Sequence, residues 1–153
     1  MKQIALTQGR FAIVDDEDFE RLNAISWCYS KGYAVHSMAN GGHIYMHRMV
    51  NGTPKGYQTD HLNLDKLDNR RSNLRTATRA QNNTNRPVKS NSSSCFKGVY
   101  LDGRHGHWIA QIKPIGKKRV YLGSFKREVD AATAYNLGVA LYGAEHTRMN
   151  IGG

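Results

Sequence analysis

The sequence predicts an α+β fold made of two small domains. A Ser-rich polar segment over residues 86–94 lacks hydrophobic periodicity and separates two segments that each have an apolar pattern of their own. After it come three alternating stretches and one helical stretch, the pattern of a small antiparallel sheet covered by one helix. We therefore expect one domain over residues 1–85, a linker over residues 86–94 and a second domain over residues 95–153.

Short elements are expected in the first domain. An acidic run over residues 15–18 suits the positive, N-terminal end of a helix over residues 15–25, because carboxylates are stabilised there. A carboxylate metal cluster at this run is the alternative. Alternating patterns predict two strands before the helix and, after it, a hairpin that turns at Asn40-Gly41-Gly42. The four expected strands are residues 3–7, 11–15, 33–39 and 43–50.

The second domain has a clearer pattern. Alternation over residues 96–101, 107–113 and 119–123 predicts three strands, and helical spacing of small and aromatic residues over 127–142 predicts a helix that covers their apolar face. The opposite face is then polar and basic. The inward residues are Trp108, Ala110, Ile112, Val120 and Leu122, facing a helical stripe of Ala131, Ala134, Tyr135, Gly138, Val139 and Tyr142. The outward residues are Gln111, Lys113, Arg119 and Tyr121.

The composition excludes several classes of protein. The chain of 153 residues has no apolar run near the roughly 18 residues that a membrane-spanning helix needs. Its two cysteines cannot build a disulfide framework, and without a Cys-x-x-Cys pair any metal ion has to use oxygen or imidazole ligands. The first ten residues lack the apolar core of a secretory signal, so we expect a cytoplasmic, intracellular protein.

The formal net charge of +10 is unevenly distributed along the chain. Residues 1–36 contain four basic and five acidic side chains, residues 37–90 nine and three, and residues 91–153 nine and four. Two separate basic segments favour a polyanionic partner over a merely solvated surface, since such surfaces neutralise phosphates and release counterions. Nucleic acid is the expected partner.

The central segment over residues 57–85 contains the residue types that phosphodiester hydrolysis requires. Asp60-His61 follows an extended stretch, Asn73 comes twelve residues after the histidine, and Asn82 lies nine residues further on, in a stretch that can start a helix at Thr78. A neutral imidazole can deprotonate water, and a divalent cation can neutralise the developing charge. Taken singly, the same residues could be a turn pair, a cap and polar helix surface.

Three words of sequence, D-H, D-N-R-R-S-N-L-R and T-x-x-Q-N-x-x-N, occur in this order within the first 90 residues. They resemble the HNH nucleases of the ββα-metal fold, specifically the homing endonucleases of phages and group I introns. The resemblance implies His61 as general base, Asn73 as the group that orients its imidazole, and Asp60 with Asn82 as ligands of Mg2+ or Mn2+. Amide oxygen suits such hard ions better than zinc.

Several positions near this site stay open. Asn83 or Asn85 can replace Asn82 as the metal ligand, because the sequence does not fix the helix phase. His47 stands in the word H-R-M-V, which is similar to an H-R-[LM]-V word upstream of the HNH site, where the histidine packs or contacts DNA. A catalytic role for His47 is the alternative. Four arginines around the site are expected to contact phosphate, although a solvated basic loop would look the same. They are Arg70, Arg71, Arg75 and Arg79.

The second domain contains the words F-K-G-V-Y, H-W-I-A-Q-I-K and R-V-Y-L-G-S-F, followed by A-A-T-A-Y-N-L-G-V-A-L-Y-G and Asn150. These words resemble the AP2 DNA-binding domain over residues 95–150, in which a three-stranded sheet lies in the major groove. Arg and Trp are common where Lys113 and Tyr121 stand, so the base preference of that family is not carried over. The resemblance implies DNA contacts from Lys97, Tyr100, Arg104, Gln111, Lys113, Arg119 and Tyr121.

Together these patterns predict a monomeric, site-directed endonuclease that cuts double-stranded DNA with Mg2+ or Mn2+, positioned by its AP2-like domain. We expect no membrane and no obligatory protein partner, and the resemblance fits a phage gene in a bacterial host. The first alternative is a DNA-binding regulator with an inactive HNH segment, which the completeness of the four-residue site disfavours. The second is an RNA-binding protein, which needs exposed aromatic residues on the sheet, where only Tyr100 and Tyr121 qualify.

Overall fold

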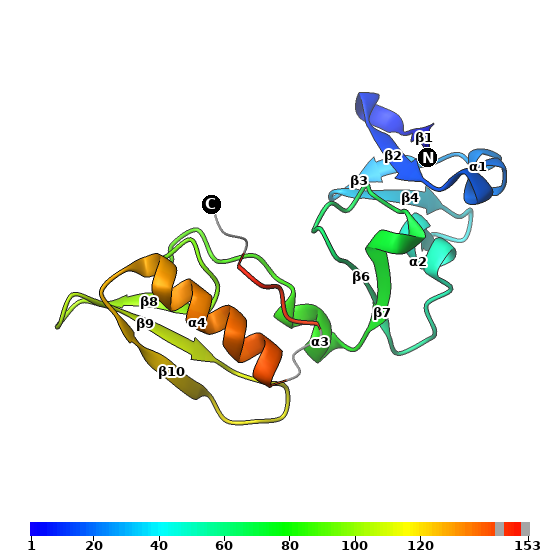
Figure 1. Ribbon diagram of the computed structural model, residues 1–153. Helices are drawn as coiled ribbons and strands as arrows, with labels where there is room; N and C mark the ends of the chain where they lie inside the picture. Colours follow the sequence, from blue (N-terminus) through cyan, green and yellow to red (C-terminus); the bar gives the residue numbers. More distant parts are fainter. Residues whose placement is uncertain (143–145, 151–153) are drawn as a thin grey trace. The chain divides into compact units, whose positions relative to one another are not determined.

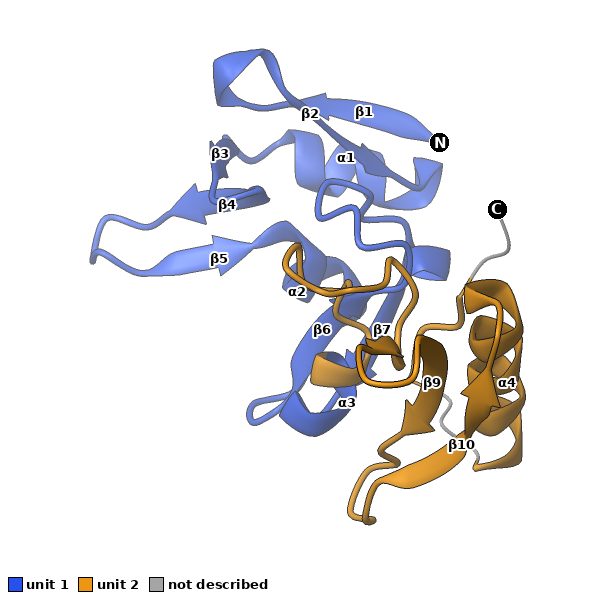
Figure 2. Cartoon of the chain, turned by 90° about the vertical axis from the view of Figure 1, so that its left-hand side faces the viewer, with its two compact units in different colours: residues 1–82 blue, residues 83–153 orange. Residues whose placement is uncertain are grey.

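The computed structural model describes residues 1–142 and 146–150, and the chain divides into two compact units (Figure 1, Figure 2). The first unit covers Met1–Asn82 and the second Asn83–Gly153. Both combine helices with small sheets, so the α+β prediction is confirmed. Residues 86–94, expected to link two domains, fall within the second unit. In the described part of the chain, no helix is both long and apolar enough to cross a membrane.

A hairpin and a helix open the first unit. β1 (Lys2–Ala5) pairs antiparallel with β2 (Phe11–Val14), and the 3-10 turn η1 (Thr7–Gly9) lies between them. α1 (Asp16–Asn23) follows, with three acidic side chains in its first turn, where the helix dipole stabilises carboxylates. Both predicted strands and the helix-start role of the acidic run are confirmed.

A three-stranded antiparallel sheet follows, in the order β3 (Cys28–Ser30), β4 (Tyr33–Ser37) and β5 (His43–Tyr45). The predicted hairpin is therefore present, whereas β3 was not predicted.

The strand predicted over residues 43–50 is wrong beyond Tyr45, because Met46–Asn51 forms the helix α2. Met46 and Val50 are both buried, and a spacing of four residues brings two side chains to one face of a helix. Gly52 ends this helix with a φ of 60°, a left-handed conformation that glycine adopts without steric cost. The sequence H-I-Y-M-H-R-M-V thus contains both a strand and a helix.

A second hairpin follows, and then a short helix that crosses the boundary between the two units. β6 (Gln58–His61) pairs antiparallel with β7 (Leu74–Ala77), a strand that was not predicted, and the 3-10 turn η2 (Arg71–Asn73) leads into β7.

Helix α3 (Arg79–Thr84) begins after Thr78, as predicted. The Thr78 hydroxyl accepts a hydrogen bond from the Gln81 amide at 3.3 Å, and Gln81 Oε1 accepts one from the Thr78 amide at 2.7 Å. This reciprocal capping box satisfies two backbone donors that would otherwise lack a partner at the start of the helix.

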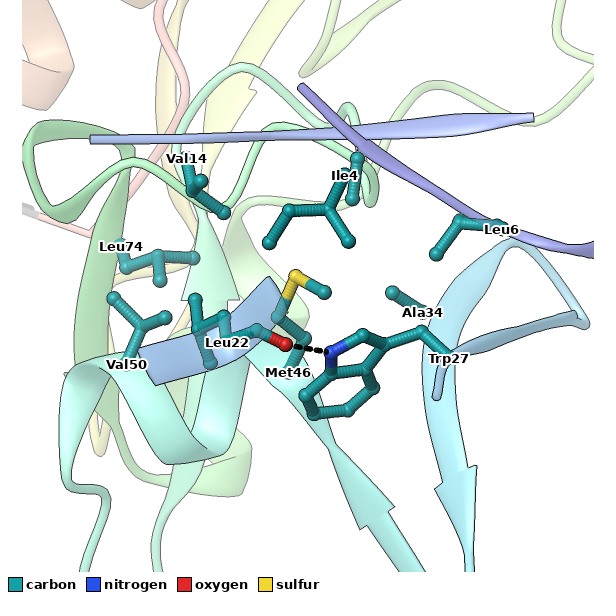
Figure 3. Close-up of a cluster of buried hydrophobic side chains, with 10 residues drawn as sticks. Ile4, Leu6, Val14, Leu22, Trp27, Ala34, Met46, Val50 and Leu74 are labelled. Carbon is teal, nitrogen blue, oxygen red and sulfur yellow. Dashed lines mark hydrogen bonds between the residues drawn. The ribbon is translucent and has the colours of Figure 1, made fainter. Parts of the chain in front are cut away.

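The hydrophobic core of the first unit joins its three small sheets to its helices. Figure 3 shows the indole of Trp27 reaching into this core, where its Nε1 donates to the Leu22 carbonyl at 2.8 Å. A buried indole thus keeps its polar group satisfied. The buried residues are Ile4, Leu6, Ala12, Val14, Leu22, Trp27, Ala34, Met46, Val50 and Leu74.

The second unit is a three-stranded antiparallel meander with one helix packed on it. β8 (Val99–Asp102), β9 (His107–Ile112) and β10 (Val120–Phe125) lie in the order β10-β9-β8, and α4 (Glu128–Leu141) packs on the sheet (Figure 1). The predicted strands and helix are confirmed. Of the predicted helical stripe, Tyr142 is 38% exposed and contributes least to the core. The buried residues are Val99, Ala110, Ile112, Ala131, Ala132, Tyr135 and Val139.

The Ser-rich segment over residues 86–94 is hydrogen-bonded to the second unit. The Ser94 hydroxyl donates to Glu128 Oε1 at 2.6 Å, which ties the end of the segment to α4. The Leu101 amide donates to the Ser93 hydroxyl at 3.0 Å, which ties it to β8. These two contacts give the serines a structural use that composition alone does not indicate.

Gly98 should be required for the packing of the second unit. Its φ is +72°, and an added Cβ would collide with the ring of Tyr135 and with the Gln111 carbonyl. We expect Gly98→Ala to lower the free energy of unfolding of this unit by roughly 2–4 kcal/mol, since strained backbone and overpacking add. Hydrogen exchange of α4 amides during urea titration measures this. Gly103→Ala is the matched control, because its Cβ would meet no atom within 4 Å.

Candidate active site

The hairpin β6–β7 positions the two residues of the D-H word. Asp60 lies directly opposite Arg75 and His61 opposite Leu74. Consecutive residues of a strand point to opposite faces, so the carboxylate and the imidazole leave the hairpin on different sides. Both are buried, with exposed fractions of 4% for Asp60 and 6% for His61.

The imidazole of His61 is oriented by Asn69. His61 Nε2 lies 3.2 Å from Asn69 Oδ1, while Asn69 Nδ2 donates to the Leu67 carbonyl at 3.3 Å. Because the amide nitrogen is directed to a carbonyl, its oxygen faces the ring, and Nε2 must be the protonated nitrogen. Nδ1 therefore holds the lone pair. Burial lowers the pKa of His61, opposed by the bond to Asn69 and by nearby carboxylates, so the ring is neutral near pH 7.

The loop that contains Asn69 is fixed to the first hairpin of the unit. The Ile13 amide donates to the Leu67 carbonyl and the Asn69 amide donates to the Ile13 carbonyl, each at 2.8 Å. A parallel bridge between Ile13 and Asp68 results. Strand β2 thereby holds the backbone on both sides of Asp68, and Asn69 is only 1% exposed.

Asn73, predicted to orient the imidazole, braces this same loop. Its Oδ1 accepts from the Asn63 amide at 3.0 Å and its Nδ2 donates to the Asp68 carbonyl at 2.8 Å. Asn73 thus bonds to the loop that contains Asn69, whereas Asn69 itself contacts the His61 ring. Asn69 stands beside Asp68 in the D-N-R-R word, but nothing in a single sequence shows that this asparagine is buried.

The predicted metal ligands share one side of β6. Gln58 and Asp60 are two residues apart and so point to the same face of the strand. Asn82 Nδ2 donates to Gln58 Oε1 at 2.7 Å, which places the Asn82 amide at that face. Because Nδ2 is bonded to Gln58, Oδ1 is the atom of the Asn82 amide that could bind a cation. Asn83, one of the alternatives to Asn82, is exposed, and Asn85 is buried.

The donor set fits a hard divalent cation. A carboxylate and an amide oxygen are the ligands that Mg2+ and Mn2+ prefer. Asp60 Oδ2 accepts two bonds from Arg75, from Nε at 3.0 Å and from Nη2 at 2.7 Å. No group of three His, Cys, Asp or Glu side chains with metal-site geometry occurs in the described residues, so a cation here would rely on one carboxylate, the amide and water.

Three of the four arginines predicted to contact phosphate are paired with carboxylates inside the first unit. Arg70 donates to Asp68 Oδ2 at 2.6 Å, and Arg75 to Asp60. The exception is Arg79, which is exposed and, among the described residues, has no ionic partner. The basic loop is thus largely neutralised by its own surroundings.

Arg71 ties the loop to helix α1. Its Nε and Nη2 donate to the two carboxylate oxygens of Asp18 at 2.7 Å and 2.9 Å, and its backbone amide donates to Asp15 Oδ2 at 2.8 Å. Asp18 is only 2% exposed, and its bond to Arg71 is the main reason that its pKa is lowered. The acidic run therefore supports the helix and the loop together.

A cluster of aromatic rings packs against His61. The ring of His47 lies 5.1 Å from that of His61 and 5.1 Å from that of Tyr33, while Tyr45 lies 5.4 Å from His47. His47 is buried, and among the described residues its Nδ1 has no hydrogen-bond partner. Burial lowers the pKa of His47 to about 3, with smaller contributions from His61 and Arg48. His47 thus packs against His61 as a neutral, buried ring.

The second unit contains the other predicted DNA-binding residues, most of them on the outer face of its sheet. Tyr121 lies opposite Gln111 and is 63% exposed, and Tyr100 on β8 is 39% exposed. Lys113 and Arg119 are exposed at the ends of the strands that contain this pair.

Two other predicted DNA-binding residues lie off this face. Lys97 donates through Nζ to the carbonyls of Thr84 and Arg86, so its ammonium group is engaged within the unit. Arg104 lies in the exposed turn between β8 and β9, where its amide donates to Asp102 Oδ1 at 3.0 Å.

Comparison with known proteins places the chain in a family. A sequence profile of the HNH endonuclease family matches residues 41–84. An uncharacterised HNH endonuclease of Acanthamoeba polyphaga mimivirus is 31% identical over 137 residues, which cover 85% of this chain and 69% of the viral protein. The chain belongs to the HNH endonuclease family. The matched residues of the HNH profile include all four predicted site residues, Asp60, His61, Asn73 and Asn82.

A second similarity is shorter. An AP2-like ethylene-responsive transcription factor of Arabidopsis thaliana is 41% identical over 49 residues, which cover 31% of this HNH family member and 9% of the plant protein. The chain thus spans less than a tenth of that relative. No solved structure matches the chain.

The buried His47 predicts how the stability of the first unit changes with pH. The ordinary pKa of the imidazole is 6.5, and burial lowers it to about 3. Between these two pH values the unfolded chain therefore binds a proton at His47 that the folded unit does not bind. Stability should fall by about 1 kcal/mol per pH unit as the pH decreases below 6.5. Urea denaturation at pH 7.5 and pH 5 measures the loss.

A matched pair of variants isolates the contribution of His47. In His47→Phe the loss between pH 7.5 and pH 5 should shrink, because the orphaned nitrogen and its titration are removed together. In His43→Gln, which alters an exposed histidine of the same unit, the loss should match that of the wild type. Equal pH dependence in His47→Phe and in the wild type would show that His47 is not the group responsible.

Proposed function

We propose that this protein is a site-directed DNA endonuclease of the homing type, in which the first unit cuts and the second unit selects the site. The observation that carries the proposal is the buried, neutral imidazole of His61, whose tautomer is set by Asn69 and which directly follows Asp60 in the sequence. Membership of the HNH endonuclease family supports the reaction class.

The proposed chemistry begins with a proton transfer to His61. Nδ1 holds the lone pair, so it takes the proton from the water that attacks phosphorus, while Nε2–H stays bonded to Asn69. The resulting imidazolium is stabilised by Asn69 Oδ1 and by the nearby carboxylates that raise the pKa of the ring. Asn73 and Asp68 keep the loop, and hence Asn69, in place.

Asp60 and Asn82 are the residues that would hold a divalent cation. Bound there, Mg2+ or Mn2+ would supply neutralisation of charge on the phosphate and the leaving oxygen. The oxygen-only donor set supports this assignment. Arg79 is the exposed cation nearest in sequence to these ligands and is proposed to contact the DNA backbone.

The second unit is proposed to bind duplex DNA through the outer face of its sheet. Tyr100, Gln111 and Tyr121 provide side chains that can contact base edges, and Lys113 and Arg119 provide charges for phosphates. The identity with part of a plant AP2-like transcription factor supports this assignment. Lys97 is left out of the proposed contact set because its ammonium binds backbone carbonyls.

Replacing the proposed general base tests the function directly. We expect His61→Ala to lower the rate of duplex cleavage by about 10²- to 10⁴-fold with Mg2+ or Mn2+ present, because the attacking water loses its base. DNA affinity, measured by fluorescence anisotropy, should change little. Single-turnover cleavage of plasmid and mixed-sequence duplex is the measurement.

The exposed His43 provides the control for this experiment. His43→Ala removes an imidazole of the same unit and should cleave at the wild-type rate. Cleavage by His61→Ala at the rate of His43→Ala would refute the proposed mechanism. Full activity in EDTA would refute the need for a metal ion.

The outer sheet face is tested by removing its charges. We expect Arg119→Ala to weaken duplex binding and to reduce the slope of log affinity against log salt by about 1, the effect of one lost phosphate contact. Gln111→Ala should instead weaken binding to the duplex that the wild type prefers more than binding to duplexes of other base sequence, because a lost base contact affects the preferred site most. Anisotropy titrations at several salt concentrations measure both effects.

Lys126→Ala is the charge-matched control, because Lys126 lies beyond the end of β10. An equal loss of affinity in Arg119→Ala and Lys126→Ala would mean that the outer face is not the binding surface.

A further inference from the structure

One ion pair of the first unit occupies the group that the proposed function assigns to the metal. Arg75 donates twice to Oδ2 of Asp60, through Nε at 3.0 Å and Nη2 at 2.7 Å. The two residues face each other across the β6–β7 register, so the pair is built into the hairpin. The carboxylate is 4% exposed at its side chain and the guanidinium 22%.

The guanidinium and a divalent cation would compete for this carboxylate. Asp60 contributes one negative charge, and in this structure Arg75 already balances it. A cation bound to Asp60 would place two positive charges beside a third, in surroundings that are largely shielded from water. The cation therefore binds poorly for as long as Arg75 stays on Asp60.

The other paired arginines of the loop differ in what they hold. Arg70 binds Asp68, which also accepts from Asn63, and Arg71 binds Asp18, which also accepts from Arg21. The first pair lies within the loop, the second joins the loop to α1, and neither carboxylate is one of the proposed metal ligands. Arg75, in contrast, binds Asp60, a proposed metal ligand. Asp60 lies on the same face of β6 as Gln58, whose side chain is bonded to Asn82, the other proposed ligand.

A phosphodiester is the natural alternative partner of Arg75. Phosphate oxygens accept paired N–H bonds from guanidinium as carboxylates do, and arginine keeps its charge at every pH of interest. Transfer of Arg75 from Asp60 to the DNA backbone would free the carboxylate at the place where the cation is needed.

We propose that Arg75 is a latch that couples metal binding to DNA binding. In the free protein it neutralises Asp60 and disfavours the divalent cation; when duplex DNA binds, Arg75 moves to a phosphate and Asp60 takes up the cation. This inference rests on the proposed function, because it takes Asp60 as a metal ligand and duplex DNA as the substrate. Its consequence is that the enzyme stays unloaded until substrate is present.

Linkage makes the proposal measurable. If duplex DNA raises the affinity for the cation, the cation must raise the affinity for duplex DNA by the same factor. Couplings of this kind are typically about 5- to 150-fold.

The experiment measures Mn2+ affinity of the full chain by electron paramagnetic resonance of unbound Mn2+, without and with a short duplex. All proteins also contain His61→Ala, so that the duplex is not cleaved. Variants Arg75→Gln and Arg79→Gln are compared, since each removes one guanidinium but only Arg75 is paired with Asp60. Asp60→Asn measures the binding of Mn2+ elsewhere on the protein and the duplex, which is subtracted.

The latch predicts three results. Duplex raises the Asp60-dependent Mn2+ affinity at least about 5-fold in the Arg75 protein. Arg75→Gln raises the affinity of the free protein several-fold and reduces the enhancement by duplex. Arg79→Gln leaves the affinity of the free protein unchanged, although it weakens duplex binding.

Other results separate the two proposals. If Asp60→Asn leaves Mn2+ binding unchanged, the proposed metal site itself is wrong. If Asp60→Asn removes binding but Arg75→Gln lowers the free-protein affinity, or matches Arg79→Gln, the metal site stands and the latch is overturned. Should Arg75→Gln fail to fold, Arg75→Lys replaces it. In that case the protein with Arg75 intact and His61→Ala still decides the question, because no increase of its Mn2+ affinity by duplex overturns the latch.

Discussion

Two backbone hydrogen bonds between strand β2 and the loop after β6 hold the candidate active site together. They join Ile13 to Leu67 and to Asn69, residues that are more than fifty positions away in the sequence. These two bonds fix the backbone on both sides of Asp68 and so give the buried amide of Asn69 its position. The orientation and protonation of His61 depend on that amide, so the chemistry proposed for His61 depends on the first hairpin of the chain.

This dependence explains the rest of the unit. Helix α1 supplies Asp18, which holds Arg71 and with it the start of β7. Met46 of the hydrophobic core (Figure 3) accepts a hydrogen bond at its sulfur from Asn69 Nδ2 at 3.5 Å, so the core also contacts the site. Asn73 secures the loop from the inside by bonding Asn63 and Asp68. The loop is thus braced from several directions, as expected for a site whose reacting groups need fixed geometry.

The distribution of charge follows the same logic. Arg70, Arg71 and Arg75 are all paired with carboxylates of the first unit, so a basic sequence segment does not translate directly into a basic surface. Local neutralisation lets buried carboxylates persist, because an unpaired buried charge is very costly. It also means that these arginines serve the structure of the first unit, since each is already bonded to a carboxylate.

Local signals in the sequence predicted the α+β class and most of the elements, because periodicity, turn residues and short motifs act over short stretches of chain. The motifs also predicted Asp60, His61, Asn73 and Asn82 as site residues. The sequence could not determine that Met46–Asn51 turns into a helix, since tertiary burial of two apolar residues decided between strand and helix there. Nor could it show that Asn69 contacts His61 or that Arg75 binds Asp60. Those pairings join residues eight and fifteen positions apart, and only the folded hairpin and its braced loop bring them together.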